Sequence, residues 1–497
     1  MPDKGTEISE KLESIIENLL GKEFLINPFF RISKSTPEQL APYKYINLKY
    51  SRELLALYLF ISTPINFIKI IIQIFFSLFF SYQYLYFKPK NYLTEVLFVS
   101  HAIGANITKK DSDQFFAFIP EYCAEKNLNT TIVYTNHTKH GYNKNLNLLN
   151  LKTKKVNRFL IPKFLKPKEL IKYYLTITVM FIKCVRIGVV NYFTDPLNSK
   201  ILFSAANSFF KRPTYANYLL LLRIKDFYSE NAIQVIFMTL EGHSYEQCLV
   251  NEINQAAPSL QVVLYQHSPI TRAHLGIKNF MEKNIYNIII MTTGTYYTNY
   301  LKQLSNIPEF VLIGSNKAEH LQENKEIYKS KTLLFAPEGT IAATKSFLKL
   351  IRLMSKEDPV HHYLLRLHPN LPRNIGIYLL IRNLKRKQNF SLSNKSLSID
   401  LNLAKFVFYR SSAVGLQSLN SSATPIFYSE QGHNMLNVIP PNSELFYTVE
   451  TFKNALDIVN SHEDRNSIKD KKIIFESLFS ELIYQNLDDI LKKTRLN

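Results

Sequence analysis

Cysteine is scarce in this sequence, and several diagnostic motifs are missing from it. Three cysteines, Cys123, Cys184 and Cys248, occur in 497 residues. They lie far apart and lack metal-ligand spacing, so we expect no disulfide framework and a reducing compartment. The sequence also has no Walker-type phosphate loop, zinc-finger spacing or aromatic RNA-binding signature. These absences argue against nucleic acid as a partner.

Two further absences concern metals and secretion. No Asp-x-Asp pair stands at the end of a predicted strand, so we expect catalysis without a metal, and no motif points to another cofactor. A long apolar run near the N-terminus starts too late for a signal peptide, and no small-residue cleavage site follows it. The chain is therefore expected on the cytoplasmic side of a membrane.

Positive charge is in clear excess. The chain has 60 lysines and arginines against 40 acidic residues, for a formal net charge of +20. Such an excess predicts an anionic partner, which is nucleic acid, a membrane surface or a phosphorylated substrate. Charged residues make up 20% and hydrophobic residues 46%, as is typical of folded proteins. Because 497 residues exceed one ordinary core, we expect two domains and an appendage.

Two stretches are apolar enough to contact lipid. The first lies between residues 52 and 88, and its part from 65 to 87 is close to the roughly 20 residues that a membrane span needs. A proline and several polar residues interrupt it. An in-plane or re-entrant contact is therefore favoured over a true span or a buried core helix. The second stretch, 168–193, carries Lys183 and Arg186 among apolar residues, which suits an anionic leaflet.

Short apolar runs alternate with helical patterns along the rest of the chain. The predicted strands of the first half are "EVLFVS", "TTIVYT", "IQVIFM", "LQVVLY", "YNIIIM" and "EFVLIG". Those of the second half are "TLLFAP", "HYLLRLHP", "KFVFYRSS" and "TPIFYS". Helices are expected at 113–125, 244–256, 342–355 and 473–493. This alternation predicts an α/β protein in which two Rossmann-like domains with parallel sheets face a central cleft.

The expected domain order follows from these patterns. We expect a helical, membrane-associating segment at 1–92, with a short amphipathic helix at its start. A Rossmann-like acceptor domain with a helical insertion follows at 93–314. A nucleotide-binding Rossmann-like domain is expected at 330–470 and a C-terminal helix at 471–497, with the two domains joined near 315–330.

Ionisable side chains follow the predicted strands of the first half. In open parallel sheets, ligands bind outside the carboxyl ends of the strands. His101, Glu241 and His267 stand at such ends. Gly242 would let the backbone turn directly after Glu241. Glu241 is therefore the preferred candidate for a catalytic base, with His267 placed to hydrogen-bond it or the acceptor.

Two other carboxylates are candidates for the same role. Glu246 lies in the first turn of the helix that Ser244 is expected to cap, where a carboxylate gains from the helix dipole. Glu246 thus has a structural explanation as good as a catalytic one. Asp113 is a reserve candidate.

The second half places a different set of residues at its strand ends. In "YLLRLHP", alternation puts Arg366 and His368 on one face, and Pro369 ends the strand. In "YRSSAVGLQSL", a strand runs into Ser411 and Ser412 before a helix. One serine suffices as a helix cap, but the two hydroxyls and the helix N-terminus could also bind a phosphate.

The motifs "RLHP", "SSAVGLQSL…ATPIF" and "EGHSYEQCL…VVLYQHS" resemble those of bacterial surface-carbohydrate glycosyltransferases of the GT-B type. The similarity covers roughly residues 95–440. It is strongest to enzymes of lipopolysaccharide and capsule synthesis that use CMP-activated acidic sugars, such as Kdo or sialic-acid-like sugars. In that group an HP motif and a serine pair hold the CMP phosphate and ribose, which implies His368, Pro369, Ser411 and Ser412 here. Gln417 stands where these enzymes commonly have a glutamate, and its bond to a ribose hydroxyl would be weaker.

The resemblance implies an inverting, metal-independent glycosyltransferase at the cytoplasmic face of a bacterial inner membrane. Its partners would be a nucleotide-sugar donor, a lipid-linked saccharide acceptor and the membrane surface, which it would contact peripherally. Arg366, His368 and the serine pair would stabilise the leaving group. Two alternatives stay open: a polyol-phosphate transferase of the teichoic-acid type, and a non-catalytic membrane-bound assembly partner.

Overall fold

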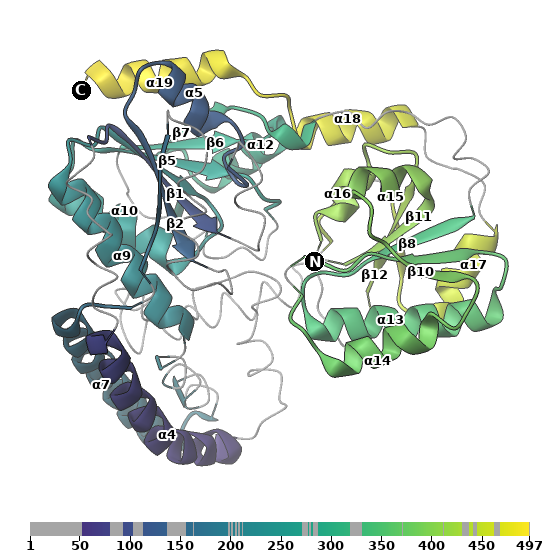
Figure 1. Ribbon diagram of the computed structural model, residues 1–497, viewed down its shortest axis with the longest axis horizontal. Coiled ribbons are helices and arrows are strands. Elements are labelled where there is room, and N and C mark those ends of the chain that lie inside the picture. The colour runs from purple at the N-terminus through teal and green to yellow at the C-terminus, as the bar shows by residue number, and fades with distance from the viewer. Residues whose placement is uncertain are drawn as a thin grey trace.

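The computed structural model contains two parallel β-sheets, one in each half of the chain (Figure 1). Element labels follow Figure 1. The structure describes residues 52–79, 93–102, 113–136, 156–162, 164–196, 199, 202–203, 206, 209–210, 212–270, 277, 280–281, 287–318, 331–369, 371–410, 412–429, 437–440, 445–461 and 468–496. The expected short helix at the N-terminus lies outside these residues.

The first sheet has seven strands in the order β3-β2-β1-β4-β5-β6-β7. All neighbouring strands pair in parallel. The strands are β1 (Val96–Ala102), β2 (Thr130–Asn136), β3 (Val156–Leu160), β4 (Val235–Thr239), β5 (Gln261–Gln266), β6 (Ile288–Thr292) and β7 (Glu309–Leu312). The order reverses direction between β1 and β4, as in doubly wound dinucleotide-binding folds.

The second sheet has six strands in the order β10-β9-β8-β11-β12-β13, again all parallel. The strands are β8 (Thr332–Ala336), β9 (His362–Leu365), β10 (Phe390–Leu392), β11 (Ala404–Tyr409), β12 (Thr424–Tyr428) and β13 (Tyr447–Val449). Here the order reverses between β8 and β11. The two sheets thus repeat one winding pattern, which confirms the predicted α/β class with two Rossmann-like domains. That the two domains face one cleft stays a prediction.

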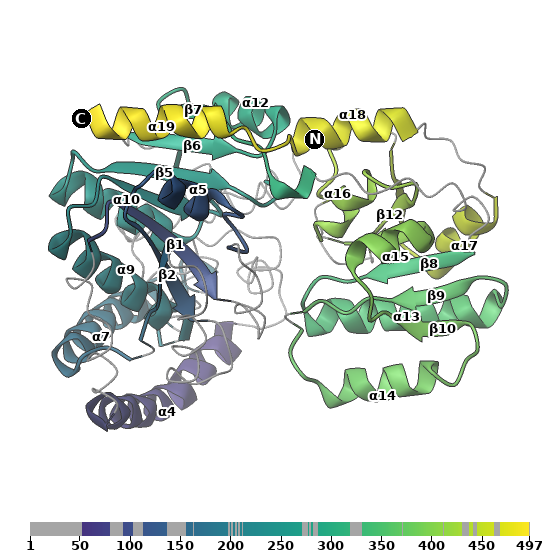
Figure 2. The same cartoon turned by 45° about the horizontal axis from the view of Figure 1, so that its top comes forward.

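Helices flank both sheets (Figures 1 and 2). In the first half they are α4 (Arg52–Phe79), α5 (Ile119–Glu125), α7 (Pro167–Val190), α9 (Arg212–Glu230), α10 (Ser244–Ala256), α12 (Thr295–Leu304) and the 3₁₀ helix η5 (Asn316–Ala318). In the second half they are α13 (Ile341–Glu357), α14 (Ile375–Leu384), α15 (Leu397–Leu403), α16 (Val414–Ser418), α17 (Phe452–Ser461), α18 (Ile468–Leu478) and α19 (Tyr484–Leu496).

The strands form because nearly continuous apolar runs can be buried on both faces of a parallel sheet. Every residue of β4, β5 and β6 is buried. Side chains alternate between the two faces: Leu97 and Val99 join one core, whereas Val96 and Phe98 join the other. The ten strands predicted from these runs are all present, and β3, β10 and β13 are additional.

Several predicted boundaries differ from the structure. The helix expected from Asp113 begins only at Ile119, because residues 113–117 form a tight turn closed by a bridge from Asp113 to Ala117. The apolar stretch at 65–87 is helical as far as Phe79, in a helix that starts at Arg52 and continues through Pro64. Residues 80–87 lie outside the described part.

The C-terminal region contains two helices rather than one, and it returns to the first domain. α19 packs Leu487, Ile490 and Leu491 into a core of the first sheet, as Figure 1 shows beside α5. The segment between the helices bonds the strand ends through its backbone: the Ser480 N–H donates to the Thr293 carbonyl over 2.7 Å, and the Ile483 N–H donates to the Ile313 carbonyl over 2.8 Å. The last residues therefore complete the first domain.

Candidate active site

Glu241 lies where the fold of the first domain reverses. β4 ends at Thr239, and Leu240 and Glu241 follow before Gly242 turns the chain with a φ of 76°. A left-handed φ favours glycine, so the turn predicted at Gly242 is confirmed. α10 then starts at Ser244, and its N-cap residue is His243 rather than the predicted Ser244.

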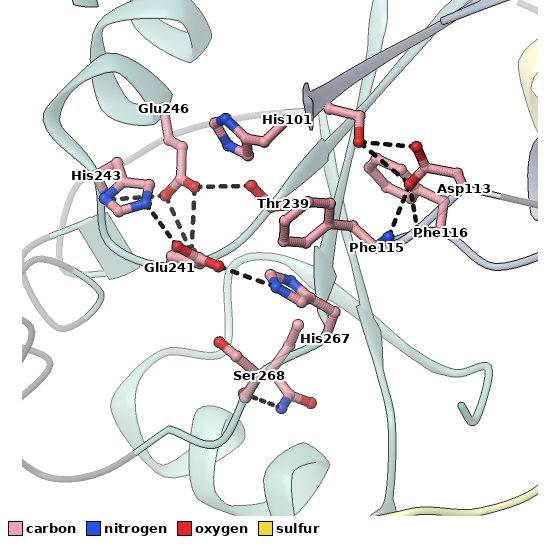
Figure 3. Close-up of polar contacts among 12 residues, drawn as sticks. His101, Asp113, Phe115, Phe116, Thr239, Glu241, His243, Glu246, His267 and Ser268 are labelled. Atoms are coloured by element: carbon pink, nitrogen blue, oxygen red, sulfur yellow. Dashed lines mark hydrogen bonds and ion pairs between the residues drawn. The ribbon is translucent and has the colours of Figure 1, made fainter. Parts of the chain in front are cut away.

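Two histidines hold the Glu241 carboxylate, as Figure 3 shows. Its Oε2 lies 2.6 Å from His243 Nε2, and its Oε1 lies 2.9 Å from His267 Nε2. The contact predicted between Glu241 and His267 is therefore present. Burial by itself would raise the pKa of the Glu241 carboxyl, but the two histidines together hold this pKa well below its usual value.

An ionised Glu241 is a weak base and a strong hydrogen-bond acceptor. Each histidine Nε2 must therefore carry a proton, which leaves Nδ1 of a neutral ring as an acceptor. His267 Nδ1 is buried and has no hydrogen-bond partner among the described residues. The arrangement is that of an oriented histidine, in which Glu241 fixes the tautomer and stabilises the ring when it gains a proton.

Glu246 holds the loop that carries Glu241. Its carboxylate accepts hydrogen bonds from Thr239 Oγ1 at 3.2 Å, from the Glu241 N–H at 3.1 Å and from the His243 N–H at 2.9 Å. Burial, together with the charge of Glu241, raises its pKa to about 8. With its oxygens bonded to this loop, Glu246 has the structural role that the sequence offered as one of two explanations.

Asp113 organises a neighbouring loop. It accepts hydrogen bonds from Ser100 Oγ at 3.0 Å and from the Phe115 and Phe116 N–H groups at 2.8 Å and 2.9 Å. The ring of Phe115 stands edge-on to His267, with ring centroids 4.9 Å apart. Asp113 therefore places Phe115 against His267. Asp113 itself is 3% exposed, and its carboxylate is occupied by these donors.

His101 lies near the end of β1, at the same edge of the sheet. Its Nε2 lies 2.9 Å from the Tyr245 hydroxyl, and its ring packs edge-on against Phe115 at 5.5 Å. Side chains from β1, β4, β5 and α10 thus meet where the strand order reverses. This is the position at which ligands bind in doubly wound sheets.

Lys317 is a member of this site that the sequence analysis did not identify. Its ammonium donates to the His267 carbonyl over 2.7 Å and lies 5.6 Å from the centre of the Phe479 ring. Burial lowers its pKa to about 8, although Glu241 opposes the shift. The only sequence signal was its place just after "EFVLIG", inside a polar stretch that resembles a linker.

The second sheet distributes its predicted residues differently. Arg366 Nη1 bonds Asp400 Oδ2 at 2.7 Å and the Lys395 carbonyl at 2.8 Å. β9 ends at Leu365, so the strand alternation expected to place Arg366 and His368 on one face does not extend to them. His368 instead packs against Gly339, where a Cβ would lie 2.7 Å from His368 Nδ1. Burial lowers the pKa of His368.

Only part of the serine motif lies among the described residues. Ser411 lies outside the described residues. Ser412 Oγ accepts a hydrogen bond from the Val414 N–H at 3.3 Å, which fits a local turn. Gln417 lies on α16, which has five residues. The dipole of so short a helix attracts a phosphate less than that of a longer helix. Pro369 forms part of the turn directly after His368.

A buried ion pair marks the reversal point of the second sheet. Glu338 follows β8 and Arg410 follows β11, and Oε1 of the former lies 3.2 Å from Nη2 of the latter. Both are about 3% exposed, and burial raises the pKa of Glu338 while Arg410 opposes the shift. The sequence analysis missed this pair, although both residues follow apolar runs as Glu241 does.

Within the described ranges, no group of three or more histidine, cysteine or acidic side chains is arranged to hold a metal ion. Two histidines bond the Glu241 carboxylate of this cluster through their ring nitrogens. The cluster can orient a histidine, accept a proton and stabilise the resulting positive charge.

The chain was compared with known proteins. No family model and no curated protein sequence matches it. Among solved structures it is similar to trehalose-6-phosphate synthase from Burkholderia multivorans, with 10% identity and a TM-score of 0.43 over 81% of this chain and 96% of that one. It is also similar to Staphylococcus aureus TarM, with 10% identity and a TM-score of 0.42 over 81% and 100%.

A third similar structure is a glycosyltransferase from Rickettsia africae, with 12% identity and a TM-score of 0.41 over 81% of this chain and 98% of that one. These values describe a distant likeness in the arrangement of elements. The function proposed for this chain therefore depends on its own residues.

Proposed function

We propose that the protein is an inverting glycosyltransferase that moves a sugar from a nucleotide donor to a saccharide acceptor. The observation that carries this proposal is the Glu241 carboxylate held by His243 and His267 at the reversal point of the first sheet. A base oriented in this way suits an acceptor hydroxyl, which must lose a proton as it attacks. The motifs around His368 and Ser412 support a nucleotide on the second domain.

In this reaction the acceptor oxygen attacks the anomeric carbon of the donor sugar. The bond from that carbon to the donor phosphate breaks, and its electron pair leaves with the phosphate. For His267 Nδ1 to take the acceptor proton, the side chains that bury it must move aside when the acceptor binds, and Glu241 then stabilises the imidazolium that forms. Glu241 thus acts through His267 and is a positioning residue, whereas the sequence alone favoured it as the base itself. His368 and Ser412 would bond the departing phosphate.

The donor best supported by the motifs is a CMP-activated acidic sugar. The proposed acceptor is a lipid-linked saccharide of the bacterial cell envelope, such as a lipopolysaccharide or capsule precursor. The enzyme would then work peripherally at the cytoplasmic face of the inner membrane. Transfer of a polyol phosphate would use the same second-domain motifs, and an assembly partner would need none of them.

Nucleotide binding separates these possibilities. We expect CMP to raise the melting temperature of the purified full chain, and His368→Ala to remove most of this rise. His362→Ala is the matched control, because His362 starts the strand after which His368 stands and bonds Ser391 instead. Transfer of a sugar from CMP would then support the proposal. Transfer of a polyol phosphate from a CDP-linked donor would support the alternative, and no stabilisation by any nucleotide would overturn both.

A further inference from the structure

α7 is apolar on two opposite faces. Its inner face packs into the core of the first domain through Leu170, Tyr173, Ile177, Met180, Cys184 and Gly188. Its outer face lies in solvent and carries six large apolar side chains: Ile171, Leu175, Val179, Ile182, Val189 and Val190 are 53–71% exposed. These residues recur at helical spacing and form a stripe about 28 Å long.

α4 extends this exposed face. It lies beside α7 in both views, and Tyr192 after α7 donates to Glu53 Oε1 over 3.3 Å (Figures 1 and 2). Its exposed large apolar side chains include Leu57, Phe60, Ile61, Ile65, Ile68, Ile71, Ile72, Phe75, Phe76, Leu78 and Phe79. Together with the outer stripe of α7, these residues define the α4–α7 surface. Large exposed apolar surfaces on proteins usually mark sites that interact with another protein or a membrane.

The charges beside the stripe are positive. Lys168, Lys172, Lys183 and Arg186 are exposed on α7. The single acidic residue of this helix is Glu169, and it bonds the buried guanidinium of Arg223. The outer face of α7 therefore combines apolar side chains with cations, which is the combination that favours an anionic lipid surface.

We infer that the α4–α7 surface lies in the plane of an anionic lipid bilayer and inserts its apolar side chains among the lipids. α7 is long and apolar enough to cross a membrane. Its inner face, however, is part of the protein core, so it cannot be surrounded by lipid while the first domain is folded. A second copy of the chain is a poorer occupant, because a two-fold contact would bring the cations of one α7 toward those of the other.

This contact deepens the proposed function, because it would hold the enzyme where a lipid-linked acceptor lies. It does not depend on the reaction, and it can be measured without donor or acceptor. A failure of vesicle binding would leave transfer to a water-soluble acceptor intact, and a failure of transfer would leave vesicle binding intact. The two proposals can therefore be rejected separately.

The test uses the full chain and sedimentation with vesicles. We expect the protein to pellet with vesicles of phosphatidylglycerol and phosphatidylethanolamine, and less with phosphatidylcholine alone. Leu175→Glu with Ile182→Glu should reduce binding to the anionic vesicles about tenfold or more, because two charges then enter the apolar stripe. Lys183→Gln with Arg186→Gln should chiefly remove the preference for anionic lipid and make binding less sensitive to salt.

The control places the same charges on other exposed apolar positions. Ile307→Glu with Val360→Glu changes side chains that are 45% and 60% exposed in the loops before β7 and β9. This variant should bind like the parent, and all variants should keep the parent melting temperature. Unchanged binding by the Leu175/Ile182 variant would overturn the inference. The inference would also be overturned if the parent did not bind vesicles but formed a dimer, and if the Leu175/Ile182 variant were monomeric.

Discussion

The two sheets share one winding order but differ in what stands at their reversal points. Beside the β1–β4 reversal, His243 and His267 both bond the carboxylate of Glu241. Between β8 and β11 the described residues include the ion pair Glu338–Arg410, next to Gly339. Because the topology is common to both, the residue types at the strand ends determine the chemistry of each edge.

In the proposed function, the first edge moves a proton and the second holds the donor phosphate. A carboxylate with a lowered pKa beside histidines stabilises positive charge as it forms. The phosphate contacts proposed at the second edge are instead hydrogen bonds to His368 and Ser412.

Changes at the first edge should reduce transfer without weakening nucleotide binding. We expect Glu241→Gln and His267→Ala each to lower the transfer rate about 10²–10⁴-fold, the range typical of a lost general base. Isothermal titration should give the parent affinity for CMP. A Glu241→Gln variant with parent-like rates at saturating donor and acceptor would contradict the assignment.

Two further measurements make this first test specific. Glu246→Gln should lose less transfer than Glu241→Gln, because Glu246 bonds the loop rather than His267. Glu241→Asp should restore part of the rate and shift its pH profile, because a shorter carboxylate still orients the ring. If the role of Glu241 were purely structural, each variant's loss of transfer rate would follow its loss of stability, and the pH profile of the rate would not shift.

Glu246 should also make stability depend on pH at the first edge. Its pKa is raised to about 8 in the folded chain from 4.5. Between these values the folded state keeps a proton that the unfolded state has lost, so stability falls as pH rises. Between pH 6 and pH 8.5 this group should lower the free energy of unfolding by about 2–3 kcal/mol, at 1.36 kcal/mol per pH unit.

Urea unfolding at both pH values measures this effect. Glu246→Gln should be less stable than the parent at pH 6, because an amide nitrogen cannot accept the loop N–H groups. Its stability should nevertheless change less with pH. The exposed Glu357→Gln variant should keep the parent slope. If the stability of Glu246→Gln changed with pH as steeply as that of the parent, the pH dependence would belong to another group.

The smallest expected effect lies at the second edge. Gly339→Ala puts a Cβ 2.7 Å from His368 Nδ1, so the ring must move. We expect CMP to bind about tenfold more weakly, about 1.4 kcal/mol, with the turnover of bound donor little changed. In the control variant, Gly376→Ala, the new Cβ approaches Asn374 Oδ1 at 3.2 Å, away from His368. Equal CMP affinity in both variants would contradict the assignment of His368 to the nucleotide site.

The sequence predicted the strands and the residues at their ends well, because both depend on local patterns. An apolar run that can be buried on two faces predicts a parallel strand wherever it occurs. The residue that follows the run then lies at the carboxyl edge. The contact between Glu241 and His267 could be expected for this reason, since β4 and β5 are neighbours in sequence and in the sheet.

Other features could not be predicted because they depend on contacts between distant parts of the chain. Lys317 lies close to His267 only because β7 ends beside the same edge, and nothing in its own surroundings indicates burial. The pKa of Glu241 depends on two ring nitrogens whose positions require the folded loop. The short strands β10 and β13 depend on their partners β9 and β12 rather than on long apolar runs.

The return of the C-terminus to the first domain has a consequence for biosynthesis. A ribosome makes the strands of the first sheet before those of the second, but Leu487, Ile490 and Leu491, which cover one core of the first sheet, are made after both. The nascent first domain therefore keeps an open apolar surface until α19 has been made, and chaperones can reach this surface during that time. A fusion or truncation that displaces α19 should thus reduce the yield of soluble chain, although α19 lies far in sequence from the strands that it covers.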